Sequence, residues 1–170
     1  LENNLFRGKA KIFNGEQELL DALDNASESI ENFDMIVVRY EGPFGAPGMP
    51  EMLDSTSRIT ALCRERNIVV GLMTDGRFSG GSVGLVIGHV GPEAAAGGAI
   101  ALIEENDTII VDLNTNELNC EQLFTSSVYA QRKAKWEREV DDNNGIHPSV
   151  GIADTRLLNR MRCSAVSAVF

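Results

Sequence analysis

Two short apolar runs, rich in β-branched residues, constrain the fold more than any other feature of this sequence. Residues 33–40 read FDMIVVRY and residues 68–74 read IVVGLMT. Continuous apolar runs of this length are typical of strands that are buried on both faces. Each run passes directly into a glycine-rich loop, EGPFGAPGMPEM at 41–52 and TDGRFSGGS at 74–82. The pattern predicts a sheet whose strand ends carry loops that are able to approach a ligand closely.

The remaining elements follow from periodicity and turn signals. Apolar segments at 8–13 and 83–90 predict further strands, and 99–119 predicts a β-hairpin with turns at EEND and NTN. Helices are predicted at 15–26, 51–67 and 121–139, with Pro50 at the first helical position and one short turn at 92–98 that stops at Gly97 and Gly98. Because the strands outnumber the long helices and do not alternate with them, we expect a mixed α/β domain with a curled, barrel-like sheet and peripheral helices.

Composition limits the classes of partner. The chain has 170 residues, of which 25 are acidic and 15 basic, for a net charge of −10. This balance argues against nucleic acid and anionic membrane surfaces, which both need clustered Lys and Arg. No apolar stretch is long enough to cross a bilayer, and no signal or transit segment is recognisable. We therefore expect a protein with no nucleic-acid and no membrane partner.

The cysteines indicate a reducing compartment. Cys63, Cys120 and Cys163 are widely spaced, and no C-x-x-C pair occurs. An odd count at this spacing favours neither a disulfide framework nor a complete zinc or iron–sulfur site. The expected location is the cytoplasm, or an organelle matrix in a eukaryote.

Three further side chains receive structural interpretations. His89 lies in an apolar run and is predicted to be a core histidine, whereas His147 precedes a proline in a polar segment and is predicted to be solvated. Trp136 is expected to pack its helix against the body of the domain.

The expected organisation is one domain over residues 1–140, followed by a linker and a helical tail at 141–170 that packs on this domain.

The two glycine loops carry the residues with chemical potential. If their strands are neighbours, both loops emerge at one edge of the sheet, where ligands bind in many α/β folds. The reactive residues of the first loop region are Arg39, Glu41 and Glu51, and those of the second are Asp75, Arg77, Ser79 and Ser82.

Each candidate also has a purely structural interpretation. Arg77 can hold a carboxylate by two parallel hydrogen bonds, or form an ion pair at the rim of a surface turn. Glu51 offers a hard oxygen ligand for Mg²⁺, or complements a helix dipole. Ser79 can act as a nucleophile or base only where its surroundings stabilise the alkoxide.

Three long segments resemble the dihydroxy-acid dehydratase and phosphogluconate dehydratase family. They are TDGRFSGGS, VVRYEGPFGAPGMPEML and GLVIGHVGPEAAAGGAIALIEENDTIIVDL, which occur in the family's order and extend the likeness from residue 8 to about 120. A weaker likeness continues through RKAKWE and LLNRMRCSAVSAV. GRFSGGS resembles the dihydroxy-acid branch. Val83, Phe44 and Ala46 depart from residues often seen in the family, and such changes can alter the choice of substrate.

The resemblance implies a domain organisation. Members of the family have an amino-terminal α/β/α domain, which supplies iron–sulfur cysteines and Mg²⁺ ligands, and a carboxy-terminal swivelling β/β/α domain that resembles a β-barrel. The present chain is similar to most of the second domain only. We therefore expect the amino-terminal domain to be its partner, the intact enzyme to be a homodimer, and Leu1 not to be a natural start.

The resemblance also implies the site residues and their roles. Ser79, as an alkoxide, matches the base that removes the proton next to the carboxylate of a 2,3-dihydroxy acid, and Glu51 matches a ligand of Mg²⁺. Four further residues are expected to support the loop or bind the substrate: Arg77, Gly76, Gly80 and Gly81. The implied cofactors are Mg²⁺ and an iron–sulfur cluster whose ligands lie outside this chain. The implied product is a 2-keto acid of branched-chain amino-acid biosynthesis, and this domain is expected to be inactive alone.

Two other functions stay open from the sequence. One is a sugar-acid (aldonate) dehydratase domain of the same family. The other is a swivelling or interaction domain without catalysis. Cysteine ligands and a lysine between acidic residues, upstream of Leu1, would favour an enzyme over the non-catalytic domain.

Overall fold

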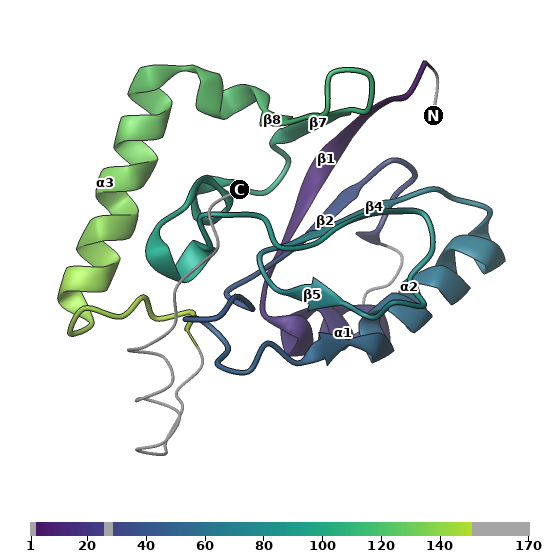
Figure 1. Ribbon diagram of the computed structural model, residues 1–170, viewed down its shortest axis with the longest axis horizontal. Coiled ribbons are helices and arrows are strands. Elements are labelled where there is room, and N and C mark those ends of the chain that lie inside the picture. Colours follow the sequence, from purple (N-terminus) through teal and green to yellow (C-terminus); the bar gives the residue numbers. More distant parts are fainter. Residues whose placement is uncertain (1–2, 26–28, 151–170) are drawn as a thin grey trace.

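Six strands form one curled sheet in the order β6-β4-β2-β1-β7-β8 (Figure 1). The computed structural model describes residues 3–25 and 29–150. The strands of this sheet are β1 (Leu5–Asn14), β2 (Met35–Arg39), β4 (Gly71–Thr74), β6 (Leu85–Ile87), β7 (Thr108–Asp112) and β8 (Glu117–Cys120). A second sheet contains only β3 (Glu51–Met52) and β5 (Arg77–Phe78).

The helices occur close to where the sequence predicts them. The α-helices are α1 (Glu16–Asn25), α2 (Leu53–Arg66) and α3 (Ser126–Asp142), and the 3₁₀ helices are η2 (Ala94–Ala96), η3 (Ala99–Leu102) and η4 (Glu121–Phe124). The short turn η2 ends at Gly97, which has the left-handed backbone expected of a helix stop. α2 ends in the same way at Asn67.

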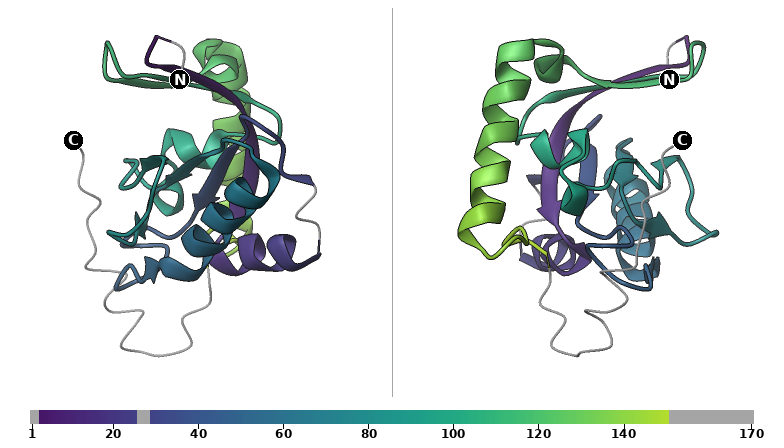
Figure 2. Two further views of the ribbon diagram at one scale, coloured as in Figure 1. Left: turned by 90° about the vertical axis from the view of Figure 1, so that its right-hand side faces the viewer. Right: turned by 60° about the vertical axis from the view of Figure 1, so that its left-hand side comes forward.

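β1 is the long strand that gives the sheet its curl. Its second half pairs in parallel with β2, from Ala10 to Asn14, and its first half pairs antiparallel with β7, from Leu5 to Lys9. The parallel strands β2, β4 and β6 therefore lie on one side of β1, and the β7–β8 hairpin extends from its other end. The result is a half-barrel, and the mixed α/β fold class predicted from the sequence is confirmed (Figures 1 and 2).

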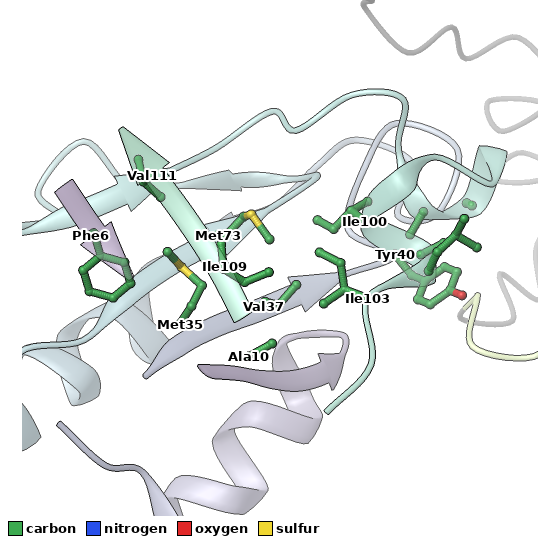
Figure 3. Close-up of a cluster of buried hydrophobic side chains, with 14 of the residues drawn as sticks. Phe6, Ala10, Met35, Val37, Tyr40, Met73, Ile100, Ile103, Ile109 and Val111 are labelled. Atoms are coloured by element: carbon green, nitrogen blue, oxygen red, sulfur yellow. The ribbon is translucent and has the colours of Figure 1, made fainter. Parts of the chain in front are cut away.

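Burial on both faces explains the continuous apolar run of β2. Met35 and Val37 point to one hydrophobic cluster, whereas Ile36 and Val38 point to a second cluster on the opposite face. Figure 3 shows the first cluster, in which Met35 and Val37 meet side chains from β1, β4, β7 and the region of η3. Because successive side chains of a strand alternate between faces, a strand covered on both sides must be apolar at every position.

Different helices cover the two faces. α1 and α2 contribute Leu19 and Ile59 to the cluster that contains Ile36. The 3₁₀ helix η3 and α3 lie on the other face, where Ile100 is fully buried and Trp136 packs against the cluster. Figure 1 and the right view of Figure 2 show α3 standing apart from α1 and α2. The packing predicted for Trp136 is therefore confirmed.

Two local predictions are wrong for identifiable reasons. Pro50 does not begin α2, because Glu51 and Met52 are extended and pair with β5 before the helix starts at Leu53. Residues 99–102 form η3 rather than the first strand of a hairpin. Short apolar runs do not distinguish a strand from a buried helical turn by periodicity alone. The hairpin itself is made by β7 and β8 around the NTN turn.

The two histidines exchange their predicted environments. His89 is exposed at a positive φ of 56°, on the loop that leaves β6. His147 is buried and stacks between Tyr40 and Trp136, with ring centroids 4.8 and 5.9 Å apart. The polar segment after α3 thus returns to the core, where Val150 is also buried. The tail predicted at 151–170 lies outside the described residues.

The hydrogen bonds of His147 identify its neutral tautomer. The backbone N–H of Ser149 donates to Nδ1 at 3.1 Å, so Nδ1 must keep its lone pair. Nε2 therefore carries the proton and donates to the carboxylate of Glu139 at 2.9 Å. Burial lowers the pKa of His147, and the neighbouring Glu139 only partly opposes this effect.

This arrangement predicts a loss of stability in mild acid. Because the folded pKa lies below the ordinary value of about 6.5, the unfolded chain binds the proton more readily as the pH falls through this value. We expect the contribution of His147 to the free energy of unfolding to drop between pH 7 and pH 5, by up to about 1.4 kcal/mol for each unit of pKa difference. Urea unfolding at several pH values in this range measures how the free energy of unfolding depends on pH. This dependence should be weaker for His147→Phe and unchanged for His89→Phe, at the exposed histidine. A pH dependence that is unchanged in His147→Phe would contradict the assignment.

Candidate active site at the β3–β5 pair

The two glycine loops meet through the short parallel pair β3–β5. Glu51 lies opposite Arg77, and Met52 lies opposite Phe78. Met52 is fully buried in the cluster below, and Phe78 packs against that cluster. The pair therefore fixes the register between the loops and leaves Glu51 and Arg77 at the surface, where each exposes about half of its side chain, 52% and 44%.

Arg77 connects the two loops. Its Nε donates to the carbonyl oxygen of Met49 at 2.6 Å, and its Nη1 lies 3.6 Å from Oε1 of Glu51. An ion pair at this distance and exposure contributes little to stability. The contacts of Arg77 join the two loops and leave the carboxylate of Glu51 accessible.

Ser79 lies just beyond β5 in a tight turn. The N–H of Ser82 donates to the carbonyl oxygen of Ser79 at 3.0 Å, which closes the turn. The N–H of Gly81 points at the Ser79 hydroxyl oxygen, with 3.4 Å between the two atoms. Ser79 is partly exposed as a residue, and its hydroxyl faces the kind of backbone donor that stabilises an oxyanion.

The three predicted loop glycines divide into two kinds. A Cβ on Gly76 would lie 2.6 Å from the carbonyl oxygen of Glu41, so this glycine allows the loops to pack backbone against backbone. A Cβ on Gly80 would meet nothing within 4 Å, and one on Gly81 would meet only the Ser79 oxygen at 4.0 Å. Packing within the described residues therefore requires Gly76, whereas the space around Gly80 and Gly81 is open to a ligand or a partner.

The carboxylate of Asp75 holds the loops together from below. It accepts hydrogen bonds from the N–H groups of Tyr40, Glu41 and Ala94, at 3.1, 3.0 and 2.7 Å. Asp75 is 2% exposed, and burial raises its pKa, while the three N–H donors oppose that effect and the charge of Glu93 adds to it. One side chain thus joins the ends of β2 and β4 to the start of η2.

The carboxylate of Glu93 also holds a loop in place. Its carboxylate accepts from the N–H groups of Phe44 and Gly45, both near 3.0 Å, and the residue is 1% exposed. A Cβ on Gly42 would collide with this carboxylate, which explains why the loop has a glycine there. The sequence interpretation missed Glu93. The sequence could have indicated it, because Glu93 is the single acidic residue in VGPEAAAGG, a segment of otherwise apolar and small residues. A carboxylate buried in such a segment needs fixed hydrogen-bond donors.

Glu41 and Glu16 link the first loop to the helices. The Glu41 carboxylate accepts from the N–H of Glu16 at 2.8 Å, at the start of α1. Glu16 in turn accepts from the Ser55 hydroxyl at 2.7 Å, in the first turn of α2. Burial raises the pKa of Glu41, although the N–H of Glu16 opposes this. Both helix N-termini are thus satisfied by carboxylates, and Glu41 has a structural role.

The described residues offer one oxygen ligand for a metal rather than a complete site. Within residues 3–25 and 29–150, no group of three or more His, Cys, Asp or Glu side chains is arranged to hold an ion. Glu51 is accessible and suits Mg²⁺ as one hard oxygen ligand. An iron–sulfur cluster does not fit these residues, because Cys63 and Cys120 belong to different hydrophobic clusters and burial raises the pKa of both thiols.

The fold and this site define a family. The profile described as "Dihydroxy-acid/6-phosphogluconate dehydratase C-terminal" matches residues 2–166. The chain therefore belongs to the family of carboxy-terminal domains of dihydroxy-acid and 6-phosphogluconate dehydratases. Over the described part of the chain, no helix is long and apolar enough to span a membrane.

Curated relatives narrow the likeness further. The chain is 52% identical over 134 residues to the dihydroxy-acid dehydratase of Prochlorococcus marinus, which is 77% of the chain and 22% of that relative. It is 45% identical over 135 residues to the enzyme of Francisella tularensis subsp. novicida, covering 79% and 23%, and 45% identical over 140 residues to that of Pyrococcus abyssi, covering 82% and 24%. The chain thus spans less than a quarter of the length of these relatives.

The buried carboxylate of Asp75 generates a stability prediction. Asp75→Asn replaces one acceptor oxygen by an NH₂ group, which then faces a backbone N–H donor. We expect this substitution to lower the free energy of unfolding by about 2–3 kcal/mol. Urea denaturation measures the loss. Asp141→Asn, at an exposed position on α3, is the matched control and should change stability by less than about 0.5 kcal/mol. Equal effects of the two substitutions would show that the three hydrogen bonds are not important.

Proposed function

We propose that this chain is the carboxy-terminal domain of a dihydroxy-acid dehydratase, a hydro-lyase that converts a 2,3-dihydroxy carboxylate into a 2-keto acid. Family membership and the names of the relatives support this reaction. The observation that carries the proposal is the β3–β5 pair, which places Glu51 beside Arg77 and brings the Ser79 turn to the same edge. An oxygen ligand, a guanidinium and a serine thus surround one exposed region.

Ser79 is the proposed base. Its oxygen takes the proton from C2, the C2–H electron pair forms the C2–C3 double bond, and the hydroxyl on C3 leaves as water once it is protonated. The enol that results becomes the 2-keto acid. A serine hydroxyl keeps its proton at neutral pH unless fixed donors and positive charge stabilise the alkoxide. The N–H of Gly81 is one such donor on this chain.

Glu51 is the proposed metal ligand of this domain. Mg²⁺, when bound, acts as a Lewis acid toward the carboxylate and the 2-hydroxyl of the substrate. Glu51 supplies one oxygen for it, and the remaining ligands come from the part of the enzyme that precedes this domain. Arg77 keeps Glu51 and the Met49 carbonyl in register, so its role is to position the site.

The domain therefore contributes half of an active site. The relatives are about four times as long as the matched segment, so they contain chain that can provide the missing ligands. The described residues of this chain do not fit the iron–sulfur cluster implied by the family likeness, and we place its ligands in the preceding domain. We expect the isolated chain to be inactive for this reason.

The loop composition favours a branched aliphatic substrate over a sugar acid. Val83 follows the Ser79 turn and is 69% exposed, so this loop presents one apolar side chain. A polyhydroxylated chain needs hydrogen-bond partners, whereas an alkyl group is accommodated by apolar contact.

The direct test is an anaerobic dehydration assay with Mg²⁺. The product of the complete coding sequence and the present 170-residue chain are each given 2,3-dihydroxyisovalerate and a panel of sugar acids. Turnover of the dihydroxyisovalerate by the longer protein only is the expected result. A preference for a sugar acid would transfer the chain to the aldonate branch. Silence on every acid, with metal and cluster confirmed as present, would favour a non-catalytic domain.

The serine assignment is tested in the same assay. Ser79→Ala in the intact enzyme removes the proposed base, and we expect kcat to fall by at least about a thousandfold with the fold unchanged. Ser82→Ala, in the same loop, should retain most of the activity. Near-normal kcat in Ser79→Ala, or loss in Ser82→Ala alone, would remove Ser79 from this role.

The metal assignment predicts a change in Mg²⁺ dependence. Glu51→Gln replaces a charged oxygen ligand with a neutral one, so the intact variant should need a Mg²⁺ concentration at least about tenfold higher for half-maximal activity. Glu65→Gln is the matched control, because it makes the same change of charge at an exposed position of α2 away from the site. A titration that is identical for Glu51→Gln and the parent would count against the ligand.

A further inference from the structure

A polar cavity lies where β1 and β2 end, on the face of the sheet that η3 and α3 cover. Its volume is about 260 Å³, and we call it the Arg39 cavity. Asn14 and Arg39 line it from the last positions of the two strands, and α3 and the segment that follows it line the other side. The carboxyl ends of parallel strands are where ligands bind in many α/β folds.

The guanidinium of Arg39 is held firmly but has no carboxylate beside it. Its Nε donates to Oδ1 of Asn14 at 2.6 Å, and its Nη1 donates to the carbonyl oxygens of Ala101 and Ile103, at 2.8 and 2.9 Å. Among residues 3–25 and 29–150, Nη2 has no hydrogen-bond partner and Arg39 forms no ion pair. Burial lowers the pKa of Arg39, and more distant charges oppose this only in part. A partly buried cation of this kind favours an anion as its partner.

Two further side chains of the Arg39 cavity also have free donors. Oδ1 of Asn14 is occupied by Arg39, so the NH₂ group of this amide is left without a partner in the described part of the chain. Lys135 lines the cavity from α3, is exposed, and forms no ion pair with any described residue. The uncommitted donors therefore belong to two cations and one amide.

The two carboxylates that line the cavity are already bonded. Glu104 pairs with Arg132 at 3.2 Å, and Glu139 accepts from the neutral His147 at 2.9 Å. Neither carboxylate is within ion-pair distance of Arg39. The free hydrogen-bonding capacity that remains in the cavity is thus mainly that of donors.

The charges of the lining set the charge of the ligand. Three cations, Arg39, Arg132 and Lys135, face two carboxylates, so the lining has an excess of one positive charge. This excess stands out in a chain whose net charge is −10. A monoanion balances it, whereas a phosphate dianion would add a second negative charge beside the two carboxylates. The volume lies just below the range of about 300–1,000 Å³ that is typical of ligand pockets, which limits the ligand to a small molecule.

We propose that the Arg39 cavity binds a small organic monocarboxylate. Its carboxylate accepts from Nη2 of Arg39 and from the NH₂ group of Asn14, and Lys135 supplies further positive charge at the rim. Hydrogen bonds from a guanidinium to a carboxylate are among the strongest in proteins.

The Arg39 cavity lies at the start of the loop that leads to Glu51, but on the other side of the sheet. Arg39 ends β2, and the N–H of the next residue, Tyr40, donates to the buried Asp75 carboxylate. Tyr40 belongs to the hydrophobic cluster on the α3 face, whereas Met52, next to Glu51, belongs to the cluster on the opposite face. A carboxylate in the cavity would therefore support the first residues of the loop and leave Glu51 uncovered.

The single tryptophan of the chain reports on this cavity. Trp136 lines it and is the only tryptophan in the 170-residue sequence. Sodium isovalerate, titrated into the 170-residue chain at constant ionic strength, should give a saturable change in tryptophan emission, with half-saturation at about 1 mM or below. Isovaleramide, a neutral molecule of nearly the same shape, should give no change over the same concentrations. The proposal is overturned by the absence of a saturable change with isovalerate, by equal binding of isovaleramide, or by phosphate that binds as tightly as isovalerate.

Variants locate the binding. Arg39→Lys keeps the positive charge but loses Nη2, so the isovalerate concentration for half-saturation should rise at least about tenfold. Circular dichroism checks that this variant is folded.

Two further variants each remove one positive charge from exposed positions of α3. Lys135→Gln should raise the half-saturating concentration about threefold, whereas Arg138→Gln, which does not line the cavity, should leave it unchanged. Equal binding by these two variants would contradict the proposal even if Arg39→Lys does not fold. The readout needs neither Mg²⁺ nor turnover, so its failure leaves the proposed dehydratase reaction standing, and the failure of that reaction leaves this site standing.

Discussion

The burial of the Asp75 carboxylate is the constraint on which the candidate site depends. Three backbone N–H groups from two separate segments, Tyr40–Glu41 and Ala94, converge on this one side chain. A buried carboxylate without such donors would be very costly, so the loops after β2 and β4 and the start of η2 must keep their relative positions. Glu93 adds donors from Phe44 and Gly45, and the packing of Gly76 against Glu41 leaves no room for slippage. The accessible residues Glu51, Arg77 and Ser79 therefore lie on loops whose backbones are held in place by the buried carboxylates below them.

The sequence was most informative where a pattern has one physical explanation. The run at 33–40 contains no alternation because β2 is covered on both faces, and the structure confirms a buried strand there. The run at 99–102 has the same apolar character, yet it forms a 3₁₀ helix, because tertiary packing rather than local preference decides such short segments. His147 shows the same limit from the polar side. Its stacking on Tyr40 depends on a contact that spans more than a hundred residues, which no local window contains.

The candidate site was predictable in part for a related reason. Loops that follow neighbouring parallel strands emerge at one edge, so the approach of the loops containing Glu51 and Arg77 was predicted on the condition that β2 and β4 are neighbours, as they are. The roles of Ser79 and Glu51 came from resemblance to a family, and they stay predictions. The supporting carboxylates were less visible. Asp75 was grouped with the reactive residues and Glu93 was not singled out, although both have structural tasks in the described residues. Whether an acid is a ligand or an internal brace depends on how many N–H donors surround it, which is a property of the folded backbone.

The divided pairing of β1 has a mechanical consequence. β1 takes part in two hydrogen-bond ladders of different kind, a parallel ladder with β2 along one half and an antiparallel ladder with β7 along the other. The β7–β8 hairpin thus joins the sheet through the ladder at Leu5–Lys9, and Ile109 and Val111 also pack in the cluster that contains Met35. Cooperative units in proteins tend to separate along such ladders. A loss of the pairing at Leu5–Lys9 would therefore separate the antiparallel half of the sheet from the parallel half that contains β2 and β4. The domain would then lose the β7–β8 side of the half-barrel before it lost the β3–β5 pair next to Ser79.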